Sequence, residues 1–346
     1  MPSIPQSNKT FYPNMDLVRY LLSLGVVFAH LGLAGHKVPF PISSFESVGG
    51  FFALSGFLMY PNYIRHNSFK KYTLQRCRRI LPPYTFIIIL CAVGFAGITS
   101  LSLTEYFTSP TFWKYLIANL SFLNWLQPSL PGVFEGAQYT MPAVNGSLWT
   151  MKVEWSLYLS VPLFVLIVRK LPRIDKGWGA VVTIILSIAY RYFFEYLHAT
   201  TGREIYHILS YQIFGQLAYF YCGMLICFFK DKFVRHLPAA TIIGLVLYFC
   251  GLYIPVTGNA TSPFAISILV MVLSLIPRDL GFLRHRNNIS YEIYLFHWPI
   301  IQLSIYLGIN KSDTLTELGF VLALTCALAY AFHSVYEHIR SGAKYH

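Results

Sequence analysis

Four ionisable side chains interrupt an otherwise apolar stretch of the chain. The stretch runs from Met15 to His36, and the four residues are Asp16, Arg19, His30 and His36. Ionisable groups inside a membrane-spanning segment are costly and rare, and their usual interpretation is a functional site. On a helix, the eleven positions from Arg19 to His30 correspond to about 20° around the axis and about 16 Å along it. One helix face therefore carries an arginine and, deeper in the membrane, an imidazole suited to acid–base or nucleophilic chemistry.

Each of these residues alone also has a structural interpretation. Arg19 could extend to the lipid headgroups, and a single histidine is more often an ordinary buried side chain. The alignment of the two residues, together with Asp16 at about 40° from the same face, makes the functional interpretation as strong as the structural one.

A carboxylate lies close to an apolar run in the segment NGSLWTMKVEWSLYL, residues 145–159. Glu154 at this depth needs a partner or contact with water. We expect it to orient His30, or to pair with Arg19 or Lys152. The structural alternative is an anchor at the membrane interface, because the segment also holds three aromatic residues of the kind that form interfacial belts.

Three arginines, Arg76, Arg78 and Arg79, precede a Pro-Pro pair in the run RCRRILPPY, where we expect a helix to begin. Arginine binds phosphate through its planar guanidinium group, and a helix N-terminus also favours anions. Arg76 and Arg79 share a face if the run is helical. From these residues alone, membrane topology and anionic lipid explain the charges slightly better than a phosphate site does.

Two further segments combine apolar residues with small or polar ones. FFALSGFLMY, residues 51–60, contains the small residues that permit close helix packing, and packing alone explains it. ISYEIYLFHWPI, residues 289–300, places Ser290 and His297 seven positions apart and thus on nearly one helix face. Glu292 and His297 give this segment a polarity that an aromatic belt does not require.

The composition is that of an integral membrane protein. The chain has 346 residues, of which 55% are apolar and only 12% charged, against about 25% charged in soluble domains. A net charge of +12 would suggest nucleic acid as a partner of a soluble protein. Here the charge of cytoplasmic loops explains it more simply, so we expect membrane lipids and no nucleic acid as partners. The six cysteines show no metal-ligand spacing, and we expect no metal.

Apolar segments predict an all-α polytopic membrane helix bundle of about ten transmembrane helices, within a single domain of residues 1–346 whose bundle covers 15–337. The segments are 15–36, 43–64, 80–100, 151–169, 178–196, 206–229, 238–255, 261–277, 288–308 and 315–337. Basic residues concentrate in every second connection, namely 65–79, 169–176, 230–235, 278–286 and the C-terminal end. This bias predicts that both termini are cytoplasmic.

The longest connection, residues 101–150, is then extracytoplasmic. It contains Phe112–Leu126, a segment of about 15 residues that is short for a membrane span. We expect an interfacial or re-entrant helix there.

These segments, in this order, resemble acyltransferase family 3, a family of polytopic membrane enzymes that O-acylate bacterial surface carbohydrates and some small molecules. The resemblance rests on Asp16–Arg19 with His30, FFALSGF, RRILPPY, NGSLWTMKVEWSLYL and ISYEIYLFHWP, and it spans almost the whole chain. It implies an acyl-CoA-dependent O-acyltransferase, and thus a multi-pass protein of a bacterial inner membrane.

The resemblance also implies roles for individual residues. His30 resembles the essential histidine of the family, and Arg19 resembles the arginine that stands ten intervening residues before it. Arg76 and Arg79 resemble the cytoplasmic R-x-x-R pair. Glu154 resembles the glutamate of the W-x-x-x-x-E-W block.

Of the last two family blocks, the first is matched and the second is not. Ser290, Tyr291 and His297 resemble the late S-Y-x-x-Y-L-x-H-W block. The family often has E-x-P near the last span, whereas Glu337 is followed here by histidine and isoleucine. We therefore assign no catalytic role to Glu337.

The reaction implied by the resemblance begins with the acyl donor. We expect acetyl-CoA, or another acyl-CoA, to bind from the cytoplasm with its phosphates on Arg76, Arg78 and Arg79. Arg19 then guides the pantetheine arm or a phosphate toward His30. His30 acts as general base on a hydroxyl, or first accepts the acyl group itself, and the sequence does not separate these two mechanisms.

The expected acceptor is a lipid-linked or surface glycan on the outer side of the membrane. Glu154 orients the imidazole or binds this acceptor. Other expected acceptor contacts come from the two later blocks, namely Asn145, Trp149, Ser290, Tyr291 and His297. Aromatic residues in or beside the outer connection are suited to stacking on sugar rings, namely Trp113, Trp125, Tyr139 and Trp149.

A proton-coupled solute transporter is the main alternative function, with His30, Arg19 and Glu154 as a proton or anion relay. A transporter would more often show two related halves, and none is apparent in the sequence. A helical scaffold or receptor is a third alternative, which the buried ionisable residues disfavour. Thermal stabilisation by CoA is a discriminating observation, because only the acyltransferase predicts it.

Overall fold

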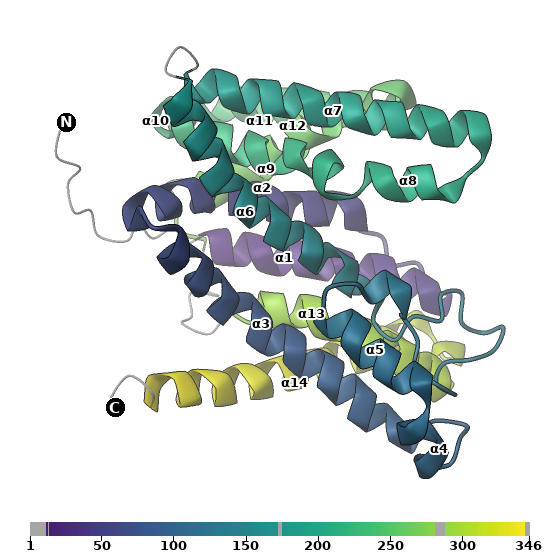
Figure 1. Cartoon of the computed structure of the whole chain (residues 1–346). Coiled ribbons are helices and arrows are strands. Elements are labelled where there is room, and N and C mark those ends of the chain that lie inside the picture. Colours follow the sequence, from purple (N-terminus) through teal and green to yellow (C-terminus); the bar gives the residue numbers. More distant parts are fainter. Residues whose placement is uncertain (1–11, 13, 172–174, 281–287, 343–346) are drawn as a thin grey trace.

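The computed structural model describes residues 12, 14–171, 175–280 and 288–342, and the described chain is helical with no strand (Figure 1). The long helices are α1 (Asn14–His30), α2 (Ser44–His66), α3 (Phe69–Gly94), α6 (Trp149–Lys170), α7 (Lys176–Thr201), α9 (Ile213–Phe228), α11 (Leu237–Tyr253), α12 (Gly258–Leu275), α13 (Ser290–Tyr306) and α14 (Thr314–Gly342). The shorter α-helices are α4 (Leu103–Thr108), α5 (Pro110–Leu120), α8 (Glu204–Ser210) and α10 (Lys230–Arg235). Every apolar segment predicted from the sequence overlaps one long helix, so the predicted all-α bundle is confirmed.

Seven helices of the described chain are long and apolar enough to cross a membrane. They are the helices that occupy Asn14–Ala34, Phe69–Gly97, Gly146–Lys170, Lys176–Thr201, Glu204–Phe228, Gly258–Leu275 and Thr314–Ser341. Among the remaining predicted spans, α11 and α13 have 17 residues each. The protein is thus an integral membrane protein, while the number of ten spans stays a prediction.

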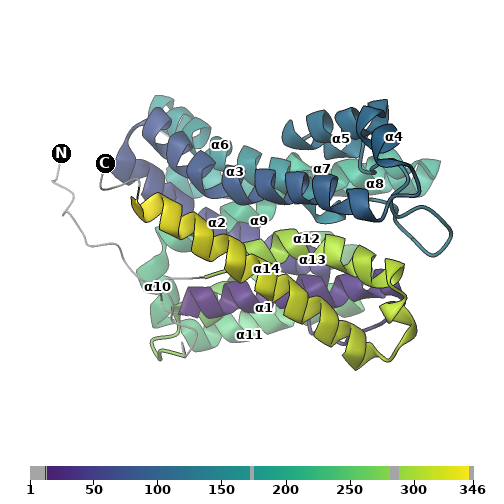
Figure 2. The ribbon, with the colours of Figure 1, turned by 90° about the horizontal axis from the view of Figure 1, so that it is seen from below.

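The helices run roughly parallel and antiparallel to one another, and their connections gather at two ends of the bundle (Figures 1 and 2). The start of α1, the end of α14 and the basic helix α10 lie at one end, and α4, α5 and α8 lie at the other. This is the arrangement that the charge bias predicts for two termini on one side, although the side itself stays a prediction. Four of the basic residues behind that prediction lie outside the described residues, namely Arg173, Arg284, Arg286 and Lys344.

The prediction that a helix begins at the Pro-Pro pair is wrong. Helix α3 begins at Phe69, where the Ser68 side chain accepts a hydrogen bond from the Lys71 backbone N–H, and Pro82 and Pro83 lie inside the helix. Pro82 has no N–H to offer to the carbonyl four residues before it. The Tyr336 hydroxyl of α14 donates to that carbonyl, Arg78 O, at 2.6 Å. The arginines therefore project from the middle of a helix and not from its N-terminus.

The bundle packs most closely where α2 crosses α9. A Cβ atom at Gly56 would lie 1.8 Å from Phe220 O, and one at Gly223 would lie 1.9 Å from Ala53 O. No side chain fits at either position, so the two backbones are in direct contact. This confirms the packing function predicted for residues 51–60.

Helix α13 is the most enclosed element, with 14 of its 17 residues buried. It packs against α1 and α14 and contacts α3. Because it carries Ser290, Tyr291 and His297, the late sequence block lies in the interior of the bundle.

The connection over residues 101–150 contains only short helices before α6, while its interfacial placement stays a prediction. Helix α5 has 11 residues, which is about 16 Å of helix and too short to span a membrane. After it, the chain returns to the bundle, where the Gln302 side chain donates to the carbonyls of Met141 and Ala143 at 2.7 and 2.9 Å. These hydrogen bonds fix the loop that precedes α6 against α13.

Candidate active site

Two histidines from distant parts of the chain form a hydrogen-bonded pair. His30 ends α1, and its Nδ1 lies 2.8 Å from Nε2 of His297 in the middle of α13. The two rings are within 5° of parallel. His297 is completely buried, with 0% of its surface exposed.

The partners of His297 determine where the hydrogens of the pair lie. His297 Nδ1 is 3.3 Å from the Ile293 carbonyl oxygen, which can only accept, so this nitrogen carries a hydrogen. Nε2 of the neutral ring then accepts, and His30 Nδ1–H donates to it. The His30 ring makes no other hydrogen bond within the described residues. Its Nε2 therefore has an available lone pair, as a general base or nucleophile requires.

This geometry corrects two predictions. Glu154 does not orient His30, because His297 does. His297, predicted as an acceptor contact, is completely buried and hydrogen-bonds His30. The sequence could not have revealed the pair, since the residues are 267 positions apart.

The loop before α6 holds Trp298 against the histidine pair. The Trp298 ring stands edge-on to His30, with ring centroids 4.7 Å apart, and its indole N–H donates to the Ala143 carbonyl at 3.1 Å. A Cβ atom at Gly146 would lie 2.4 Å from the Trp298 ring, so only glycine permits this contact. Asn145 Nδ2 donates to the Leu295 carbonyl at 2.8 Å.

The hydrogen bonds of Asn145 change its interpretation. Its Oδ1 also accepts from the Ser147 hydroxyl at 2.6 Å, and the residue is 6% exposed. Since both ends of the amide are occupied by protein groups, Asn145 positions the loop. A direct contact with the acceptor would require it to give up these partners.

A cavity of about 940 Å³ opens between α3, α13 and α14. It is lined by Tyr291 and by many ionisable side chains, namely His66, Lys71, Arg76, Arg78, Arg79, Glu292, His333, Glu337 and Arg340. Its volume lies in the upper part of the range for small-molecule sites, about 300–1,000 Å³. The cations outnumber the carboxylates, so the cavity is suited to a large anionic ligand.

Two smaller cavities share lining residues with this basic cavity. The first, of about 50 Å³, shares Arg76, Arg79 and Tyr291 with it and adds Arg19 and Glu154. The structure thus brings together the arginines and the glutamate that were predicted separately.

The second of the two smaller cavities has a volume of about 40 Å³. It shares Glu154 and Tyr291 with the first and adds Thr150 and Tyr294. The Tyr294 ring lies 6.0 Å from the His297 ring. Tyr291 lines all three cavities. Neither His30 nor His297 lines any of the three, and Tyr294 of the third cavity is the lining residue that contacts the histidine pair.

Glu154 and Arg19 do not pair with each other. Glu154 Oε1 accepts a short hydrogen bond from the Tyr158 hydroxyl. Arg19 Nη1 bonds Asp16 Oδ1 at 2.9 Å, and Asn288 Nδ2 donates to the same oxygen at 2.8 Å. The predicted pairing of Glu154 with Arg19 or Lys152 is therefore wrong, although Arg19 and Glu154 face the same cavity.

Arg76 and Arg79 differ in their surroundings. Arg76 is 6% exposed, its Nη1 contacts Met59 Sδ at 3.4 Å, and its guanidinium lies 6.0 Å from the centre of the Tyr158 ring. Its Nε has no hydrogen-bond partner within the described ranges. Arg79 is exposed at the same cavity. A buried and an exposed guanidinium thus stand at the point where the basic cavity narrows.

Ser290, the first residue of α13, is held by hydrogen bonds to Asn288 and to α1. Its hydroxyl donates to Asn288 Oδ1 at 2.5 Å, and its carbonyl accepts from the Ser23 hydroxyl of α1 at 2.8 Å. The residue lines the 50 Å³ cavity. Ser290 therefore lies beside the same cavity as Arg19 and Glu154.

The aromatic residues predicted to stack on sugar divide into two groups. Trp113 and Trp125 are 55% and 64% exposed on the outer connection. Tyr139 is only 7% exposed and packs against Phe134, so it is not available to a sugar ring. Trp149 is partly buried against the core.

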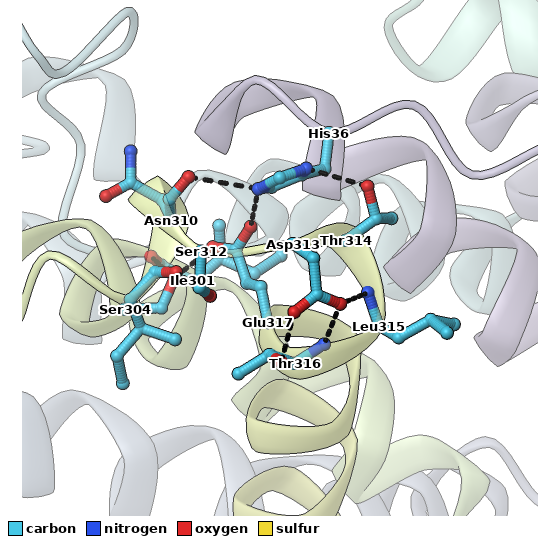
Figure 3. A network of polar contacts seen from close by, with 11 residues as sticks. His36, Ile301, Ser304, Asn310, Ser312, Asp313, Thr314, Leu315, Thr316 and Glu317 are labelled. Carbon is cyan, nitrogen blue, oxygen red and sulfur yellow. Dashed lines mark hydrogen bonds and ion pairs between the residues drawn. The ribbon is translucent and has the colours of Figure 1, made fainter.

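His36 belongs to a network of polar contacts around the start of α14 (Figure 3). Its Nδ1 lies 2.9 Å from Thr314 Oγ1, and its Nε2 lies 3.0 Å from Asn310 O and 3.3 Å from Glu317 Oε2. Glu317 is fully buried and also accepts from the Ser304 hydroxyl at 2.5 Å. This network ties the end of the first span to the start of α14, and it lies apart from the histidine pair.

Comparisons with known proteins agree with the sequence motifs. A family profile described as an acyltransferase domain matches residues 12–334. Nodulation protein 10 of Rhizobium leguminosarum bv. viciae is 27% identical over 324 residues, covering 85% of this chain and 84% of that protein. O-acetyl transferase of Shigella phage Sf6 is 22% identical over 316 residues, covering 88% of this chain and 90% of that protein.

A longer relative and the solved structures complete the comparison. Peptidoglycan O-acetyltransferase OatA of Listeria monocytogenes serovar 1/2a is 21% identical over 342 residues, covering 86% of this chain and 50% of that protein. No solved structure matches the chain. Because the family profile spans nearly the whole chain, this integral membrane protein belongs to acyltransferase family 3.

Proposed function

We propose that this chain is a membrane O-acyltransferase that moves an acyl group, expected to be acetyl, from acyl-CoA to a hydroxyl group of a carbohydrate. The observation that carries the proposal is the His30–His297 pair in a bundle that also holds an arginine-lined cavity, together with two smaller cavities that share lining residues with it. O-acetyl transfer named in two of the relatives supports the reaction class.

The donor would enter the basic cavity. Guanidinium groups bind phosphate oxygens through paired N–H donors, and Arg76, Arg78 and Arg79 all line this cavity. Arg19 and Arg76 line the narrower cavity beyond it. This order suits a ligand whose phosphates remain in the wide cavity while its thinner arm extends inward.

The histidine pair supplies the chemistry of the proposed reaction. His30 Nε2 accepts the proton of the acceptor hydroxyl, and the resulting oxygen nucleophile attacks the thioester carbonyl. The thiolate of CoA leaves and takes up the proton. His297 accepts the His30 Nδ1–H bond throughout and thereby stabilises the imidazolium that forms.

An acyl relay through His30 uses the same geometry. In that mechanism Nε2 attacks the thioester first, and the acyl group then passes from the imidazole to the hydroxyl. Glu154, which lines both smaller cavities, accepts a hydrogen bond from donor or acceptor.

The proposed acceptor is a lipid-linked or surface glycan at the outer end of the bundle, where the exposed Trp113 and Trp125 are suited to stacking on sugar rings. The corresponding location is a bacterial inner membrane, with membrane lipids as the surrounding partner. Listeria OatA is named for peptidoglycan, a carbohydrate polymer, which supports a glycan acceptor.

The test uses purified protein with radiolabelled acetyl-CoA, with and without cell-envelope glycan. We expect glycan-dependent CoA release that falls about 10²- to 10⁴-fold in His30→Ala. The matched control is His236→Ala, because His236 is exposed and lines none of the three cavities. Label that stays on the wild-type protein without acceptor would identify the relay.

Two outcomes would count against the proposal. Normal turnover in His30→Ala would remove His30 from the mechanism. Absence of acyl-CoA binding and turnover in folded protein would favour the alternative function, a proton-coupled solute transporter.

A further inference from the structure

A buried carboxylate–imidazole pair lies in the wall of the basic cavity, and no step of the proposed reaction uses it. Glu292 lies in the first turn of α13 and His333 in α14. His333 Nδ1 is 3.0 Å from Glu292 Oε1. Both side chains line the cavity that also holds Arg76 and Arg79.

Each member of this pair has one polar atom without a partner. Glu292 is 6% exposed and His333 is 9% exposed. Glu292 Oε2 and His333 Nε2 are both buried and have no hydrogen-bond partner in the part of the chain that the structure describes. Unpaired buried polar atoms destabilise a protein, so each one in a native structure calls for a specific explanation, such as a functional role.

The chemistry of the carboxylate limits that ligand. An ionised carboxylate only accepts hydrogen bonds, so Glu292 Oε2 attracts N–H or O–H groups and repels phosphate oxygens. The surrounding arginines have the opposite preference. A ligand that fills the cavity must therefore place its phosphates on the arginines and a neutral hydrogen-bond donor at Glu292.

We propose that Glu292, oriented by His333, binds an N–H or O–H group of the acyl donor. The proposal rests on acyl-CoA as the proposed donor. That molecule has N–H groups in its adenine amine and in the two amides of its pantetheine arm, and it has hydroxyl groups on its ribose and on its pantetheine arm. Glu292 would thus distinguish acyl-CoA from other phosphate-bearing anions that the same arginines attract.

The test measures the Kd of acetyl-CoA for purified full-length protein by calorimetry. Glu292→Gln keeps the size of the side chain but replaces an acceptor oxygen with an N–H₂ group. We expect acetyl-CoA to bind about 10- to 100-fold more weakly to this variant, which corresponds to one lost hydrogen bond to a charged group. His333→Gln should weaken binding in the same direction, because it removes the group that orients the carboxylate.

Three comparisons make the result specific. Pyrophosphate, which has no N–H group, should bind Glu292→Gln at least as tightly as the wild type, because the change removes a charge that repels phosphate oxygens. Glu204→Gln, at a carboxylate whose side chain is 77% exposed on α8, is the matched control and should bind acetyl-CoA as the wild type does. Melting temperatures without ligand establish that each variant is folded.

The donor fragment acetyl-4′-phosphopantetheine distinguishes the two parts of the donor that carry such groups. Weaker binding of this fragment to Glu292→Gln would assign the contact to the pantetheine arm. A loss seen only with acetyl-CoA would assign it to the nucleotide part of the donor.

Equal binding of acetyl-CoA to the wild type, Glu292→Gln and His333→Gln would refute the inference alone. If the wild type did not bind acetyl-CoA, the proposed donor would be refuted and this inference with it.

Discussion

Replacing His297 with phenylalanine tests whether the histidine pair orients His30. The change keeps an aromatic ring of similar size in the buried site, but it removes the nitrogen that accepts the His30 Nδ1–H bond of 2.8 Å. A buried N–H group without a partner costs about 1–3 kcal/mol. His30 escapes that cost by turning its ring or by changing tautomer, and either change removes the lone pair from the reactive position. Since 1.4 kcal/mol is a factor of ten, we expect kcat to fall about 5- to 150-fold.

The assay follows thiol release from acetyl-CoA in the presence of glycan. The KM for acetyl-CoA should stay close to the wild-type value, because His297 does not line the basic cavity. His297→Gln should recover part of the rate, since its amide oxygen can accept the same hydrogen bond. Comparable melting temperatures would exclude unfolding as the cause of a lower rate.

The reasoning would be refuted by a wild-type kcat in His297→Phe. It would also be refuted if the variant changed KM and left kcat unaltered, because the residue would then act on donor binding. A phenylalanine variant as active as His297→Gln would show that only the volume of the ring matters.

Two further predictions concern donor binding and stability. Arg79→Gln removes a cation from the point where the basic cavity narrows, so the KM for acetyl-CoA should rise about 10- to 100-fold with kcat within about twofold. Arg203→Gln, at an exposed arginine that does not line the basic cavity, is the control, and an unchanged KM in Arg79→Gln would exclude the phosphate contact. Glu317→Ala breaks the buried contacts to His36 and to the Ser304 hydroxyl, which should cost about 3–5 kcal/mol and lower the melting temperature in detergent. Glu204→Ala, at an exposed carboxylate, should leave the melting temperature unchanged, and an equally stable Glu317→Ala would refute the structural role of this network.

The helices could be predicted from the sequence because apolar runs of sufficient length are a local property. Every predicted segment overlaps a helix, and the short outer helix α5 also follows from its length. The start of α3 was missed for a physical reason. Its polar first turns look like a loop, and the two prolines look like a helix start. The Ser68 cap and the hydroxyl of Tyr336 on α14 make the longer helix possible.

The sequence by itself also determined the membrane class of the protein and most residues of the candidate site. Residue types and their depth along each segment pointed to His30, Arg19, Glu154 and the arginines of α3. Those features depend only on hydropathy, charge and helical spacing.

Only the tertiary structure decided which of these residues are partners. His30 pairs with His297, and Glu292 with His333, across 267 and 41 positions of sequence. Glu154 bonds Tyr158 on its own helix and leaves His30 to α13. These pairings depend on how each helix is rotated about its axis and shifted along it relative to its neighbours. Both quantities follow from packing contacts, such as that of Gly56 in α2 against α9. No local pattern encodes those two quantities, so the partners of the reactive groups become visible only once the helices are packed.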